Sequence, residues 1–358
     1  MAFTERSENF LMELIKAPSP SGFEEMARKV WREEVRHFSH EQFTDVHGSE
    51  IATIRGTSAK TSFLLVGHID EIGLIVRYID DTGLLYFAPV GGLEAANCVN
   101  QRVRLLTDSG IVEGVVGKIA WHLLSESERA NTKHEYHDLW IDIGATTKAE
   151  AEAIAPIGTP GVVGGDVVRL RNGRFAARDV DNKFGAFVVA EVMRRLWATK
   201  DTLFPTIHGV ACVQEETTFT GSTAVGYRLN PTAAIAIDVN HSMDVPGHDK
   251  RRFGDAAMGR GAILTVGVKS NNRLVAAVKK AAAGAGLTLQ LEMENGRHGT
   301  DADPMATIRQ GIPAISIGNP LRYMHSSVEV AQLSDIEAVA DVVEAFLRSV
   351  TGEVDYTP

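Results

Sequence analysis

The chain has 358 residues, and its 36 Lys and Arg against 46 Asp and Glu give a formal net charge of −10 at pH 7. Hydrophobic residues make up 44% of the chain and charged residues 23%, which is ordinary for a globular protein and excludes a disordered or low-complexity chain. An acidic balance without a Lys/Arg block argues against nucleic acid or an anionic membrane as a partner.

Nothing in the sequence indicates a membrane anchor or a disulfide framework. No apolar run approaches the about 20 residues that would span a bilayer. The first ten residues, MAFTERSENF, are charged and lack the apolar core of a signal peptide. The two cysteines, Cys98 and Cys212, lie far apart in the sequence. We therefore expect a cytoplasmic protein with no membrane partner.

The first predicted element is an amphipathic helix over residues 21–38. Ser21 and Glu24 fit a capping box, and apolar residues recur at i, i+3 and i+4. Short apolar runs follow along the chain, and continuous runs of this kind are typical of strands buried on both faces. These runs are Ile51–Ile54, Phe63–Val66, Thr206–Val213, Ala233–Val239 and Ala314–Ile317.

Helical patterns lie between the later strands, at Phe184–Ala198, Arg273–Ala283 and Asp335–Val350. Strands that alternate with helices indicate an α/β architecture. The prediction is a mixed, mostly parallel sheet with helices on both of its faces.

Residues 74–164 differ from the rest of the chain because short strand-like runs alternate with turn signals. One helical pattern, Lys148–Ile154, interrupts them. We therefore predict a β-rich module, a barrel, inserted into the α/β domain, which is made of residues 1–73 and 165–358. The strand-like runs are Leu74–Ile79, Val103–Leu106 and Ile111–Val116.

Residues of metal-ligand type follow several predicted strands. A single acidic residue in such a place usually caps a turn or helix. In an open α/β sheet, however, ligands bind in the crevice outside the carboxyl ends of the strands, so several such residues at one edge favour a site. The candidates are His68 and Asp70, Asp181 before its helix, Glu215 and Glu216, Asp238, and His325 after a short loop.

The types of these residues also favour particular metals. Imidazole with carboxylate and no thiolate suits Zn²⁺, Co²⁺ or Mn²⁺. The number of donors suits two ions about 3.5–4 Å apart that share one carboxylate and activate one water. A further carboxylate must accept the proton of that water. Glu215 and Glu216 can supply both roles, because adjacent residues point in different directions.

Several ordered motifs resemble those of metallopeptidase family 42, the tetrahedral (TET) and glutamyl aminopeptidases, some of which are also called cellulase M or endoglucanase. The resemblance covers nearly the whole chain. Its main motifs are His68-Ile69-Asp70-Glu71-Ile72-Gly73, Asp181-Asn182-Lys183-Phe184-Gly185, Gln214-Glu215-Glu216 and Arg322-Tyr323-Met324-His325-Ser326.

The resemblance implies a role for each candidate residue. Asp181 would bridge two metal ions, in an Asp-Asn pair that is often joined by a cis peptide in such enzymes. His68 and Asp238 would complete one ion, and Glu216 and His325 the other. Glu215 would be the general base. Asp70 follows His68 by two residues, so on a strand it would share that face and orient the imidazole.

The resemblance also implies partners: peptides with a free N-terminus, and further copies of the chain in a dimer or a tetrahedral dodecamer. The insert would be a PDZ-like or barrel dimerisation domain. Two departures leave the preferred N-terminal residue open. Thr217-Thr218-Phe219 replaces the common Val-Gly-Leu, and Asp181-Asn182-Lys183 replaces Asp-Asp-Arg.

Three alternatives remain beside the aminopeptidase. A metal-dependent deacylase acting on N-acylated substrates would use the same chemistry. A glycoside hydrolase needs two carboxyl groups and ordinarily no metal, and 7% aromatic residues are few for stacking on sugars. A non-catalytic assembly protein would lack a ligand or the base, whereas all of these positions are occupied by suitable residues.

Overall fold

The computed structural model describes residues 3–126, 129, 133–296 and 299–358. Within these residues, eight strands form one sheet, of which β12, β3, β13 and β16 run parallel at the centre. In sheet order the strands are β1 (Glu41–Thr44), β2 (Glu50–Ile54), β12 (Thr206–Cys212), β3 (Ser62–His68), β13 (Ala233–His241), β16 (Ala314–Leu321), β14 (Ile263–Gly267) and β15 (Gln290–Glu294).

Helices cover both faces of this sheet, as the apolar runs predict. Along β3, Phe63 and Leu65 join one hydrophobic core, and Leu64 and Val66 join another on the opposite face. The first core contains α1 (Glu5–Lys16), α2 (Glu25–Val35), α6 (Val180–Trp197), α9 (Asn272–Gly284) and α11 (Leu333–Ser349), and the second contains α7 (Thr220–Leu229) and α10 (Ala302–Met305). The predicted α/β fold class is confirmed.

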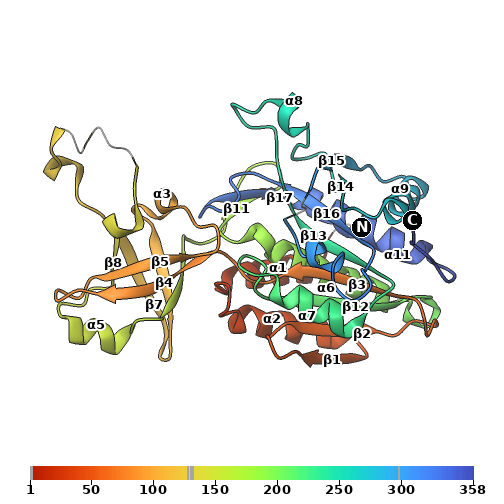
Figure 1. The fold of residues 1–358 in the computed structure, drawn as a ribbon, viewed down its shortest axis with the longest axis horizontal. Helices are drawn as coiled ribbons and strands as arrows, with labels where there is room; N and C mark the ends of the chain where they lie inside the picture. Colours follow the sequence, from red (N-terminus) through yellow and green to blue (C-terminus); the bar gives the residue numbers. More distant parts are fainter. Residues whose placement is uncertain (1–2, 127–128, 130–132, 297–298) are drawn as a thin grey trace.

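The inserted segment forms a closed barrel that projects to one side of the sheet (Figure 1). Its core is separate from the cores of the sheet and includes Cys98, whereas Cys212 lies in the core between the sheet and α7. Around the barrel, the strands of the described part are β4 (Gly73–Ile79), β5 (Leu85–Val90), β8 (Trp140–Asp142), β7 (Gly110–Gly117), β6 (Arg102–Thr107) and β9 (Pro160–Val163). Short helices accompany them at α3 (Ala95–Cys98), α5 (Lys148–Ile154), η2 (Trp121–Leu123) and η3 (Tyr136–Asp138).

A small sheet of three strands in the described residues lies where the barrel rejoins the rest of the chain: β10 (Val168–Arg169), β11 (Arg174–Ala177) and β17 (Glu329–Gln332). Shorter elements complete the described fold: η1 (Arg36–Phe38), η4 (Lys200–Thr202) and α8 (Lys250–Phe253). Among the described helices, none has the length and apolar character needed to cross a membrane.

The beginning of the chain differs from the prediction. Helix α1 was not predicted, although Thr4 caps it by accepting the Ser7 N–H. The predicted helix over 21–38 is shorter, and its capping box is wrong: Glu24 stands at the N-cap without a side-chain cap. The reason is that the Ser21 N–H donates to the Glu71 carbonyl, which holds Ser21 in a turn before the helix.

Candidate metal and catalytic site

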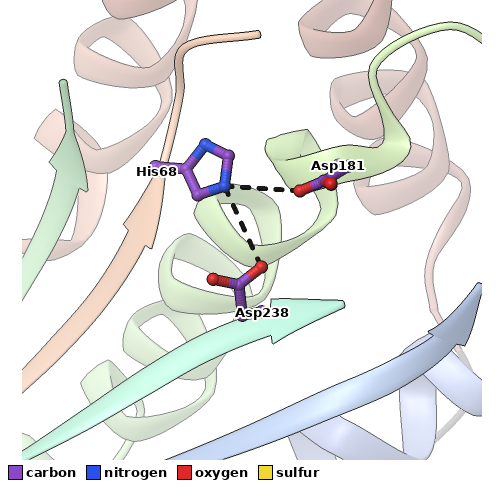
Figure 2. Close-up of side chains that lie close together, drawn as sticks. All are labelled: His68, Asp181 and Asp238. Atoms are coloured by element: carbon purple, nitrogen blue, oxygen red, sulfur yellow. Dashed lines mark ion pairs between the residues drawn. The ribbon is translucent and has the colours of Figure 1, made fainter. Parts of the chain in front are cut away.

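His68 and Asp238 come from neighbouring parallel strands. Ala236 of β13 is opposite Val66 of β3, and each candidate lies two residues further along its own strand. Adjacent strands are about 4.8 Å apart, so side chains on the same face meet. The His68 Nε2 atom lies 3.9 Å from Asp238 Oδ1, and Figure 2 shows the His68 ring facing the carboxylates of both Asp238 and Asp181.

Asp181 stands at the start of α6. The next residue, Asn182, ties this turn to the sheet, because its Nδ2 donates to the Ile237 carbonyl at 2.7 Å and its Oδ1 accepts the Gly185 N–H at 2.9 Å. The Asp181–Asn182 peptide bond is cis, as the resemblance implies. A Cβ on Gly185 would lie 2.3 Å from the Ile237 oxygen, so the turn and the strand approach too closely for any other residue.

The two oxygens of Asp181 face different histidines. Oδ1 lies 3.3 Å from His68 Nε2, and Oδ2 lies 3.4 Å from His325 Nε2. Glu216 is beside the second histidine, with Oε2 at 3.5 Å from the same nitrogen. Two groups of donors result, His68 with Asp181 and Asp238, and Asp181 with Glu216 and His325. In each group the donor atoms lie within 4.8 Å of one another.

These groups fit divalent cations. Zinc–ligand bonds of about 2.0–2.2 Å place the atoms of a tetrahedral site roughly 3.3–3.6 Å apart. The distances from each histidine to its carboxylates run from 3.3 to 3.9 Å. In addition, Glu216 Oε1 is buried and has no hydrogen-bond partner among the described residues, a deficit that a cation would remove.

Burial and mutual repulsion make this cluster of carboxylates costly without positive charge nearby. Burial raises the pKa of Glu216, and the charge of Asp181 raises it further. Burial also raises the pKa of Asp238, against the attraction of His68. Burial works in the same direction on Asp181, but hydrogen bonds from His325 and His68 outweigh it and hold its pKa well below its usual range.

Glu215 lies beside the first group without belonging to it. Its Oε2 is 3.6 Å from His68 Nε2, and burial raises its pKa well above the usual range for a carboxyl group. Its backbone N–H donates to Asp70 Oδ1, and that of Glu216 donates to Asp70 Oδ2, each over 3.1 Å. The two adjacent glutamates are therefore held at the backbone by one carboxylate.

Asp70 is placed differently from the expectation based on a strand. β3 ends at His68, so Asp70 does not continue its face. The His68 Nδ1 lies 3.0 Å from the backbone oxygen of Asp70 and 3.6 Å from its carboxylate Oδ1. The backbone oxygen of Asp70 thus orients the His68 imidazole, while the carboxylate of Asp70 accepts the backbone N–H groups of Glu215 and Glu216.

Two buried acids near the site carry no signal in the sequence analysis. Glu329, on β17, accepts the N–H of Asp181 at 3.0 Å and that of His325 at 2.9 Å, which links two donor residues. Asp301 is buried, and burial raises its pKa to about 6. Neither acid could be placed near the site without the fold.

The departure at Lys183 leaves the donor groups intact. Its ammonium contacts Asp179 and donates to the Ala17 carbonyl at 2.8 Å. Arg178 contacts Glu71 in the same buried group of charges. Lys183 therefore secures the turn that carries Asp181 through contacts with residues outside the donor groups.

Comparisons with known proteins identify the family of the chain. The family model of the M42 glutamyl aminopeptidases matches residues 48–342. A lysyl aminopeptidase from Pyrococcus furiosus is 30% identical over 97% of this chain and 98% of its own length. The crystal structure of a TET aminopeptidase from a marine sediment Thaumarchaeota archaeon has 30% identity and a TM-score of 0.91, with 97% of each chain covered.

A further solved relative is the Pyrococcus horikoshii TET1 peptidase, which can assemble into a tetrahedron or a large octahedral shell. It has 27% identity and a TM-score of 0.85, with coverage of 96% of this chain and 100% of its own. Both the sequence and the fold match over almost the full length. This chain therefore belongs to the M42 glutamyl aminopeptidase family of peptidases.

Proposed function

We propose that this chain, a hydrolase of the M42 family, removes N-terminal residues from peptides with two divalent cations, Zn²⁺ or Co²⁺, or else Mn²⁺. Asp181 would bridge the two ions. His68 and Asp238 would complete one site, and Glu216 and His325 the other. The observation that carries the proposal is that each oxygen of Asp181 faces a different imidazole.

The bound cations would supply Lewis acidity, which polarises the carbonyl of the scissile bond and acidifies the attacking water. Glu215 would accept the proton as the water oxygen adds to the carbonyl carbon. It would then deliver that proton to the nitrogen as the C–N bond breaks. Burial raises the pKa of Glu215, and a carboxyl group with a raised pKa suits a group that first takes and then returns a proton.

The free N-terminus of the substrate is inferred from the family, because an aminopeptidase must recognise a free α-amino group and N-acetylation removes it. A metal-dependent deacylase remains the second candidate because the same donors and base would serve it. Thr217 and Thr218, where the chain departs from the common family motif, are exposed and lie outside the donor groups.

The test is a panel of aminoacyl-chromogenic substrates assayed with chelated enzyme before and after addition of Zn²⁺, Co²⁺ or Mn²⁺. We expect activity to disappear on chelation, to return with metal and to be far lower on N-acetylated peptides. Full activity of rigorously metal-free protein would refute the dimetal proposal. Preference for acylated substrates would favour the deacylase, and reducing ends released from soluble cellulose derivatives would favour the glycoside hydrolase.

We further propose that residues 74–164 act as a dimerisation domain and that the dimers assemble into a tetrahedral dodecamer. The support is the separate barrel core and the assembly of the Pyrococcus horikoshii relative. Native mass measurement of the intact chain should give a dimer or a dodecamer. A monomer at micromolar concentration would contradict the proposal.

A further inference from the structure

A loop of the barrel packs against one half of the donor cluster. None of the donors in the two groups comes from the barrel. Yet a Cβ on Gly92 would lie 2.5 Å from Nδ1 of His325 and 2.8 Å from its Cε1, and a Cβ on Gly91 would lie 3.4 Å from Cβ of Glu216. The backbone of this loop, which follows β5, is therefore in direct contact with the imidazole.

Glu329 of β17 and Asn97 of α3 hold His325 in an unusual backbone conformation. Its φ is +60°, in the left-handed region that residues other than glycine seldom adopt. Such a conformation persists only where the surroundings determine it. Here the His325 N–H donates to Glu329, and the His325 carbonyl accepts from Asn97 Nδ2 at 3.1 Å. Asn97 belongs to the barrel.

The other half of the cluster has no such dependence. His68 stands on β3, where it pairs with Cys212 of β12, and Asp238 stands on β13, where it pairs with Gly318 of β16. Their side-chain hydrogen bonds and ion pairs in the described residues go to neighbours outside the barrel strands. The His68 half is thus built by the sheet together with the shared Asp181 of α6. The His325 half, in contrast, is completed by contact with the barrel.

We propose that Gly92 and Asn97 are positioning residues for His325, through which the barrel sets the metal affinity of the His325 half and leaves the His68 half unaffected. The inference rests on the proposed dimetal site. Gly92 allows the imidazole to approach the loop, because only a residue without a side chain fits there. Asn97 fixes the carbonyl of His325 and thereby the direction of its ring.

The test is metal stoichiometry and affinity, measured by elemental analysis and by calorimetric titration of chelated protein with Zn²⁺. The variants are Gly92→Ala and Asn97→Leu, with Gly165→Ala as the matched control because a Cβ there meets nothing within 4 Å. We expect wild type and control to bind two ions. Removing a group that orients a metal ligand typically costs about 10–100-fold in affinity, and we expect that loss at one ion only in both variants, with excess metal restoring activity.

Each outcome is decisive. Two ions bound with wild-type affinity in Asn97→Leu, which adds no clash of the Gly92→Ala kind, would overturn the proposal even if Gly92→Ala failed to fold. Equal weakening of both ions would overturn it as well, since the effect would then not be confined to the His325 half. Failure of the wild type itself to bind two ions would instead refute the proposed dimetal function, so the two failures are distinguishable.

Discussion

Asp70 holds the backbone of Glu215: its Oδ1 accepts the Glu215 N–H over 3.1 Å, from a position just beyond the end of β3. Asp70→Asn keeps the shape of the side chain but replaces one of the two acceptor oxygens by an NH₂ group, which donates hydrogen bonds. One backbone N–H of the glutamate pair therefore loses its acceptor. Mutation of a residue that orients the groups of a metal site typically lowers metal affinity or activity about 10–100-fold. We expect kcat to fall by that order with the metal content retained. An unchanged kcat would show that the loop keeps its position without this carboxylate.

Glu215→Gln should separate proton transfer from metal binding. The amide keeps the size and polarity of the side chain but cannot accept the proton of the water. Positioned general bases contribute about 10²–10⁴-fold, so kcat should fall by that order while KM and metal content stay close to wild type.

Glu216→Gln is the matched comparison, because it removes a donor from the His325 half and should weaken one metal ion. If Glu215 merely caps the turn after β12, its variant will retain turnover within a few-fold of wild type. Steady-state kinetics and elemental analysis on the two single variants decide between these readings.

Replacing Asp181 should do more damage to metal content than replacing any other donor, because its two oxygens serve both groups. We expect Asp181→Ala to lose both ions, and Asp238→Ala to lose chiefly the one beside His68. The measurement is metal content after dialysis against a fixed concentration of free Zn²⁺. Two equivalents retained by Asp181→Ala would exclude the bridging role.

Glu24 should make stability depend on pH in an unusual direction. Burial, with the charge of Asp70 as the next cause, raises the pKa of Glu24 to about 7 from 4.5. Between these values the folded state keeps a proton that the unfolded state has released, so this group lowers stability as pH rises through the window.

Glu24→Gln imitates the protonated form and keeps the acceptor for the Gly22 N–H. We expect it to be more stable than wild type at pH 8, by on the order of 1–3 kcal/mol, and equal at pH 4. Thermal unfolding of chelated protein at both values checks this, with Glu25→Gln on the exposed side of the same helix as control. A gain of the same size at pH 4 would point to packing as its cause.

The strands could be predicted because a strand that is buried on both faces has a continuous run of apolar residues in its sequence. Phe63–Val66 reads as an apolar run since its alternate residues enter different cores. Because ligands of an open α/β sheet bind outside the carboxyl ends of its parallel strands, His68 and Asp238 could also be predicted to lie together at that edge. The N-cap of α2 could not be predicted from the local sequence, because Ser21 is held in a turn by Glu71, which is distant in the sequence.

Supporting residues around the site were beyond reach for the same reason. Glu329 lies 148 positions from Asp181, and nothing near it marks it as a partner of that backbone. Asn97 and Gly92 belong to a segment that reads as an ordinary turn of the insert, and their contact with His325 exists only once the barrel is folded and docked. Local patterns thus reveal the donors, whereas the groups that aim them come from tertiary contacts.

The distribution of the two cysteines has a practical consequence. Cys98 lies in the barrel core and Cys212 in a core of the sheet, and burial raises the pKa of both thiols, that of Cys98 to about 12. Neither can react with an alkylating reagent while its own core stays closed. The rate at which each thiol is alkylated therefore reports the rate at which its own core opens. Pulsed labelling followed by peptide mapping would measure the opening of the barrel and of the sheet separately in the same sample.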